Sequence, residues 1–203
     1  MSYELGWQKF YTFLLAIDDG IMGKKKVLAI SGSTRAKSTN LNYIQAISDL
    51  AADLFYVEVF HGLLNIPAFN PDDDVDNPPP VIKEFRDQLR NADGVLICTP
   101  EYAMGVPGSL KNAIDWTVSS MEFSQKPVAL ITASLSGLKG HAALLETLYV
   151  IESRITASTG LVISFAKTKI SHDCKITDEA TLTEVKKLIE AFSVLMKEEP
   201  ANP

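Results

Sequence analysis

The chain has 203 residues, 46% of them hydrophobic and 22% charged, and a formal net charge of −6. This length and balance predict one globular domain with a full core rather than a disordered chain. The acidic charge argues against a nucleic-acid partner, because contacts to phosphate backbones depend on clustered Lys and Arg. The two cysteines lack the spacing of a zinc site or a disulfide framework, so we expect a cytoplasmic protein without a metal centre.

The chain is expected to begin with an N-terminal extension, residues 1–23, ahead of a domain over residues 24–198. Its apolar stretch, residues 10–17, is too short to cross a bilayer and lacks the basic start of a signal peptide. We therefore expect no membrane partner. Two interpretations stay open: a misplaced start codon, or an amphipathic helix that packs its aromatic side chains on the domain or on another subunit.

Apolar runs and helical spacings then alternate to the end of the chain. The runs expected to form buried strands are residues 26–31, 54–60, 94–99, 128–133 and 161–165. The segments with helical spacing are residues 40–53, 81–90, 109–118, 141–157 and 178–196. Right-handed crossovers between such strands predict an α/β fold, a doubly wound five-stranded parallel sheet with helices on both faces. Ligands of such folds bind beyond the carboxyl ends of the strands, at loops 32–39, 100–108 and 134–140 here.

The first of these loops, SGSTRAKSTN, predicts a phosphate site. Amides at a helix N-terminus lack partners within the helix and favour an anion, and hydroxyl and guanidinium groups surround them here. The candidate ligands are Ser33, Arg35, Ser38, Thr39 and Asn40. Ordinary helix capping by Ser38 or Asn40 is the alternative, but it explains one residue rather than the cluster. With one glycine, the loop matches neither a P-loop nor a dinucleotide fingerprint, which favours a terminal monophosphate and hence FMN over FAD.

The second and third loops predict a seat for a planar heterocycle. Two prolines and two glycines in TPEYAMGVPG set an unusual backbone path that can present amides and carbonyls to a ring. The alternative is a stiff turn before a helix. The candidates in this loop are Pro100, Glu101, Tyr102, Ala103, Met104 and Gly105. The candidates in the third loop are Ser134, Ser136 and Gly137. An ordinary Gly-rich turn between a strand and a helix explains this loop equally well.

From about residue 26 to residue 165 the chain resembles the NADPH-dependent FMN reductase family, which includes quinone, azo-dye and chromate reductases. The family's phosphate motif is matched at Gly32, Ser33, Arg35, Ser38 and Asn40. Its second motif is matched at Pro100, Glu101, Tyr102, Pro107, Gly108 and residues 110–116. The chain departs from the family at Ala103, which is usually Asn, and at Gly105, which is often Ser. Because the family's contacts in this loop are largely through the backbone, we expect FMN still to bind, with a flavin potential and an acceptor preference that differ from those of the family.

The resemblance implies a flavodoxin-like sheet of strand order 2-1-3-4-5, bound FMN, and NADPH or NADH as co-substrate. It also implies a homodimer or homotetramer with its site at the subunit interface. We expect a ping-pong reaction in which electrons pass to a small acceptor: a quinone, an azo compound, a flavin or a metal oxyanion. No catalytic side chain is required, because the flavin carries the redox chemistry. The alternatives are a flavodoxin-like electron carrier and a redox-sensing flavoprotein.

Several reactive side chains are not expected to act as catalytic groups or metal ligands. Cys98 is expected to be a buried thiol within a strand, and Cys174 to belong to a solvated loop. His141 has no partner of the kind a hydrolase needs. Although Glu101 resembles an acid or base by type, we expect it to support its turn and the following helix.

Overall fold

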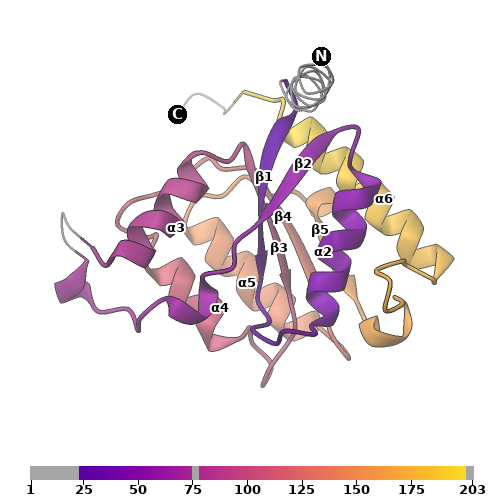
Figure 1. The fold of residues 1–203 in the computed structure, drawn as a ribbon, viewed down its shortest axis with the longest axis horizontal. Coiled ribbons are helices and arrows are strands. Elements are labelled where there is room, and N and C mark those ends of the chain that lie inside the picture. The colour runs from indigo at the N-terminus through magenta and orange to yellow at the C-terminus, as the bar shows by residue number, and fades with distance from the viewer. Residues whose placement is uncertain (1–22, 75–77, 200–203) are drawn as a thin grey trace, which may run out of the picture.

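The computed structural model describes residues 23–74 and 78–199, whose five strands form one parallel sheet (Figure 1). The strand order is β2-β1-β3-β4-β5, which confirms the predicted topology. The strands are β1 (Lys25–Ser31), β2 (Phe55–Val59), β3 (Gly94–Thr99), β4 (Val128–Ala133) and β5 (Gly160–Ile163). The helices are α2 (Thr39–Leu50), α3 (Pro80–Arg90), α4 (Gly108–Asp115), α5 (Leu138–Val150) and α6 (Glu179–Leu195). Residues 1–22 lie outside the described part of the chain, so the predicted extension stays a prediction.

Two apolar cores, one on each face, fix the sheet between two helical layers. Alternate residues of β1 point to opposite faces: Val27 belongs to the core beneath α2 and α6, and Leu28 to the core beneath α3, α4 and α5. Figure 1 shows α2 and α6 together on one side of the sheet and α3 and α4 on the other. All six residues of β3 and of β4 are buried, which explains their unbroken apolar runs. In the described ranges, no helix is long and apolar enough to cross a membrane.

The ends of two helices differ from the predicted ones. Helix α5 begins at Leu138, directly after Gly137 at φ 94°, and ends at Val150 rather than at residue 157. Helix α4 ends at Asp115 rather than at residue 118. The carbonyl of Trp116 accepts hydrogen bonds from the guanidinium of Arg86 on α3. The carbonyl of Trp116 therefore has its hydrogen-bond partner on another helix. The periodicity of the sequence does not indicate this contact.

The connection from β2 to α3 is irregular, as its prolines predicted, but it is firmly attached to α4. Asn112 accepts a hydrogen bond from the amide of Phe69 at 2.7 Å and donates one to the carbonyl of Pro67 at 2.8 Å. Trp116 donates a ring N–H to the same carbonyl at 2.9 Å. The rings of Phe69 and Trp116 meet edge to face, with centroids 5.1 Å apart. Two residues of the second motif therefore hold a surface segment in place.

Candidate functional site

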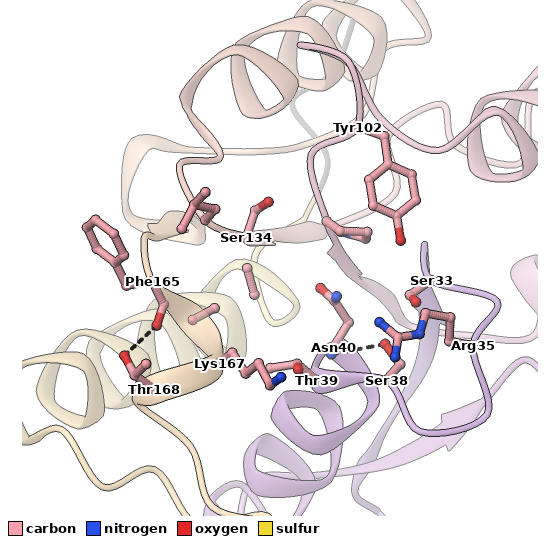
Figure 2. A pocket seen from close by; sticks show the side chains of 14 residues that line it. Ser33, Arg35, Ser38, Thr39, Asn40, Tyr102, Ser134, Phe165, Lys167 and Thr168 are labelled. Atoms are coloured by element: carbon pink, nitrogen blue, oxygen red, sulfur yellow. Dashed lines mark hydrogen bonds between the residues drawn. The ribbon is translucent and has the colours of Figure 1, made fainter.

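At the carboxyl edge of the sheet, the first loop, the end of β3 and the β4–α5 loop enclose a cavity of about 420 Å³ (Figure 2). The predicted residues that line it are Ser33, Arg35, Ser38, Thr39, Asn40, Pro100, Tyr102 and Ser134. The residues that line it without having been predicted are Ala133, Leu135, Phe165, Ala166, Lys167 and Thr168. Four segments far apart in the sequence, the three predicted loops and the segment after β5, thus meet where a doubly wound fold binds its ligand.

A close approach between two strands directs the first loop toward this cavity. The amide of Gly32 donates to the carbonyl of Cys98 at 2.8 Å, so the chain leaves β1 pressed against the end of β3. A Cβ atom at Gly32 would lie 2.2 Å from the hydroxyl oxygen of Thr99. Only glycine fits at this contact, and residues 33–38 then pass over the edge of the sheet.

The start of α2 presents hydrogen-bond donors to the cavity. Ser38 is the N-cap and accepts the amide of Asn40 at 3.2 Å, so the capping interpretation is correct for this one residue. Ser33 is 7% exposed and Asn40 4% exposed, and both line the cavity. Within the described residues, the hydroxyl of Ser33 and the side-chain amide nitrogen of Asn40 donate no hydrogen bond. Both residues line the cavity, so these donors are available there to an anionic oxygen ligand such as a phosphate.

The second loop contributes fewer lining residues than predicted. Residues 102–105 form a tight hairpin in which Tyr102 and Gly105 exchange two backbone hydrogen bonds of 2.9 Å. Ala103 and Met104 at its tip adopt φ of 49° and 64° and are exposed. Of the six predicted residues, Pro100 and Tyr102 line the cavity, whereas Glu101, Ala103, Met104 and Gly105 do not. Cofactor contacts of those four residues stay predictions.

Glu101 instead joins two of the loops. Its carboxylate accepts the amide of Gly140 at 2.7 Å, within the first turn of α5, where the helix leaves its N–H groups without partners. A Cβ atom at Gly140 would lie 2.8 Å from the carbonyl oxygen of Gly105, so the hairpin rests directly on this helix. The expected supporting role of Glu101 is correct, but the helix that it supports is α5, not the following α4.

The third loop draws an unpredicted segment to the cavity. Ser134 lines it, while Ser136 and Gly137 lie outside the lining; Gly137 precedes α5 as its N-cap. The backbone of this loop accepts the amides of Phe165 and Ala166, each at 3.0 Å. These bonds place the short 3-10 helix η4 (Ala166–Thr168) beside the start of α2. Residue 165 was predicted to continue strand β5, but the strand ends at Ile163 and Phe165 turns at φ 53°.

The lining carries positive charge from two side chains, Arg35 and Lys167, and none of its described residues is a carboxylate. Cys98 is fully buried, and desolvation raises the pKa of its thiol, which keeps it protonated and unreactive. His141 lies outside the lining with its Nδ1 3.0 Å from the hydroxyl of Thr132, and burial lowers its pKa. In the part of the chain that the structure describes, no cluster of acidic, His or Cys side chains could hold a metal ion.

The fold and the cavity define a protein of the flavodoxin-like flavoenzyme class. Residues 25–167 match the family model described as NADPH-dependent FMN reductase. An NAD(P)H-dependent FMN reductase of Pseudomonas aeruginosa is 32% identical over 178 residues, which cover 85% of this chain and 95% of that protein. A quinone reductase of Pseudomonas putida is 37% identical over 122 residues, 58% of this chain and 64% of that protein's length. The solved structure of FerB, a flavoenzyme NAD(P)H:(acceptor) oxidoreductase from Paracoccus denitrificans, superposes with a TM-score of 0.71 at 26% identity, covering 85% of this chain and 97% of FerB.

The chain belongs to the NADPH-dependent FMN reductase family. This membership confirms the resemblance, the flavodoxin-like fold and the oxidoreductase class inferred from the sequence, with FMN and reduced nicotinamide as the cofactors of that class.

Proposed function

We propose that this protein is a cytoplasmic oxidoreductase that uses NADPH or NADH and bound FMN to reduce a small organic acceptor, preferably a quinone. The observation that carries the proposal is that Ser33 and Asn40 line one cavity with Arg35. Within the described residues, the hydroxyl of Ser33 and the side-chain amide nitrogen of Asn40 donate no hydrogen bond. A flavin phosphate supplies the acceptor oxygens and negative charge that these groups lack. The two free cysteines agree with a reducing compartment.

The residues present fit FMN in two zones. Ser33, Arg35, Ser38, Thr39 and Asn40 would hold the phosphate, while Pro100, Tyr102 and Ser134 would border the ring. When bound, FMN would supply the redox chemistry: a hydride is taken from reduced nicotinamide, which leaves oxidised, and two electrons with two protons go to the acceptor, one of those protons being drawn from solvent. The protein's own contribution would be to hold the ring and to supply positive charge at the phosphate end from Arg35 and Lys167.

Apolar and aromatic side chains surround the mouth of the cavity, where an acceptor would enter. Tyr102, Leu135 and Phe165 line the cavity yet are 52%, 74% and 62% exposed. An apolar and aromatic rim favours a planar ring over a hydrated metal oxyanion, because the oxyanion would lose its hydration there. The name of the Pseudomonas putida relative, quinone reductase, supports this preference. Nicotinamide and acceptor would use this one mouth in turn, which is the basis for a ping-pong order.

A homodimer would cover the exposed apolar groups beside this mouth, with a homotetramer as the larger alternative. Met104 at the hairpin tip is 75% exposed and Leu138 at the start of α5 is 64% exposed, and their segments touch where Gly140 meets Gly105. Exposed apolar clusters of this kind mark subunit contacts. Sedimentation of the wild type and of a Met104→Lys, Leu138→Lys double variant tests the proposal. We expect a dimer that the double variant weakens, and a wild-type monomer at micromolar concentration would contradict it.

The function itself is tested with the purified protein and added FMN. We expect a flavin absorbance spectrum, bleaching of that spectrum by NADPH or NADH in stopped flow, and parallel double-reciprocal plots with benzoquinone as acceptor. A protein that takes up no FMN at high concentration would overturn the proposal. Flavin that a reduced nicotinamide does not bleach would instead indicate an electron carrier, and bleaching without turnover on quinone, azo dye or free flavin would indicate a sensor.

A further inference from the structure

The segment after β5 is held against the start of α2 by buried contacts. The hydroxyl of Tyr43, one turn beyond Thr39 on α2, donates to the carbonyl of Ala166 at 3.0 Å, and this bond is buried. The amide of Ala166 donates to the carbonyl of Ser134 at 3.0 Å. These two bonds fix η4 between the first and third loops. Phe165 keeps a left-handed backbone at φ 53° at the entrance to η4, a conformation that surrounding contacts must maintain.

This attachment brings a second cation to the phosphate end of the cavity. Lys167, on η4, is exposed and lines the cavity together with Arg35. Figure 2 shows the side chain of Lys167 extending toward Thr39, while Arg35 approaches Asn40 from the first loop. Among the described residues, neither cation has an ion-pair partner. Two cations from different loops thus converge on the start of one helix.

We propose that Lys167 is a second cationic ligand of the flavin phosphate and, with Arg35, makes the site selective for a terminal phosphate monoester. This inference rests on the proposed FMN site. A phosphate monoester carries about −1.5 to −2 charges at pH 7, because its second pKa is near 6. One guanidinium leaves part of that charge uncompensated, and a lysine beside the same helix start balances it. The side-chain donors of Ser33 and Asn40, which line the same cavity, supply the hydrogen bonds.

Selectivity follows from the chemistry of the two cations. Riboflavin has the same ring but a neutral tail, so it would gain nothing from Lys167. Its affinity therefore reports the ring contacts alone. The difference between the FMN and riboflavin dissociation constants isolates the phosphate contribution, and a substitution at Lys167 should change that difference without changing the ring contacts.

The test measures dissociation constants for FMN and for riboflavin by quenching of flavin fluorescence at low salt. Lys167→Met is expected to weaken FMN about tenfold and to leave riboflavin unchanged. Lys167→Arg is expected to restore most of the FMN affinity, and added salt should reduce the wild type's advantage over Lys167→Met. The matched control is Lys186→Met on α6, an exposed lysine outside the cavity lining, for which both constants should stay at the wild-type values.

Each other outcome overturns the inference in a distinct way. An unchanged FMN constant in Lys167→Met would mean that the lysine does not contact the phosphate. Equal weakening of FMN and riboflavin would mean that it only supports the packing of η4. An unchanged FMN constant with a higher KM for NADPH but not for NADH would assign Lys167 to the nicotinamide's extra phosphate. Wild-type protein that binds neither flavin would overturn the proposed function itself, so the two failures are distinguishable.

Discussion

Gly32 illustrates how one residue sets the geometry of the first loop, residues 32–39. The nearest atoms to a Cβ at this position would be the hydroxyl oxygen and Cβ of Thr99, at 2.2 and 2.7 Å. Gly32→Ala is therefore expected to destabilise the protein by about 1–3 kcal/mol through overpacking. Thermal or urea unfolding without FMN measures this loss. At Gly108, a Cβ meets nothing within 4 Å at the start of α4, so Gly108→Ala is the matched control and should be neutral or stabilising. Equal stability of the two variants would contradict the argument.

Ala103 shows strain at the hairpin tip. Both central residues of this two-residue turn adopt positive φ, 49° and 64°, which is the geometry that favours Asn followed by Gly. Asn tolerates the left-handed region better than Ala does, so Ala103→Asn is expected to stabilise the protein by about 0.5–1 kcal/mol. Urea unfolding measures the change. The control is Ala142→Asn, at an exposed position of helix α5, which should lower the stability because Asn is a poorer helix former than Ala. A loss of stability in Ala103→Asn would show that the turn requires Ala for another reason.

Helix α5 and the 102–105 hairpin form one unit through Glu101. The carboxylate lies 2.7 Å from the amide of Gly140, where it stabilises the positive end of the helix. Glu101→Ala is expected to cost about 0.5–2 kcal/mol, as the loss of a helix cap does, and to speed hydrogen exchange at the Gly140 amide. Glu146→Ala, an exposed residue on the same helix, should change stability by less than about 0.5 kcal/mol. Unchanged exchange at Gly140 in Glu101→Ala would show that the contact contributes little.

Asp93 gives the whole molecule a pH-dependent stability. Burial alone would raise the pKa of Asp93, but hydrogen bonds from Lys25 Nζ at 2.8 Å and Lys26 N at 2.7 Å, with the charges of Lys25 and Lys126, hold it below its ordinary value. A depressed carboxyl pKa adds stability that is present above the unfolded pKa, about 3.9, and is lost as the pH falls through the folded value.

Asp93→Asn removes this titration while keeping the shape of the side chain. The wild type is expected to be more stable than Asp93→Asn at pH 6, and the gap should narrow as the pH falls below about 4. Urea unfolding at several pH values measures the gap. If the gap stays constant down to pH 3, the charged form of Asp93 is not what stabilises the β1–β3 junction.

The sequence by itself determined the element types, their order and the place of the first loop at the cavity. Helical and strand periodicities are local, so runs such as residues 94–99 and 128–133 indicate strands without knowledge of their neighbours. Ser33 to Asn40 are also contiguous, and one strand-to-helix turn brings them together. Both motif loops lie after strands of a doubly wound sheet, and the position of the cavity follows from that topology.

Only the tertiary structure decided which other residues reach the cavity. Lys167 and Phe165 line it because Tyr43 and Ser134 hold their segment by hydrogen bonds that span long stretches of chain. The contact at the end of α4 is also tertiary: the side chain of Arg86, on α3, donates a hydrogen bond to the carbonyl of Trp116. Contacts of this kind depend on how whole elements pack, and packing is a property of the assembled cores rather than of any local pattern.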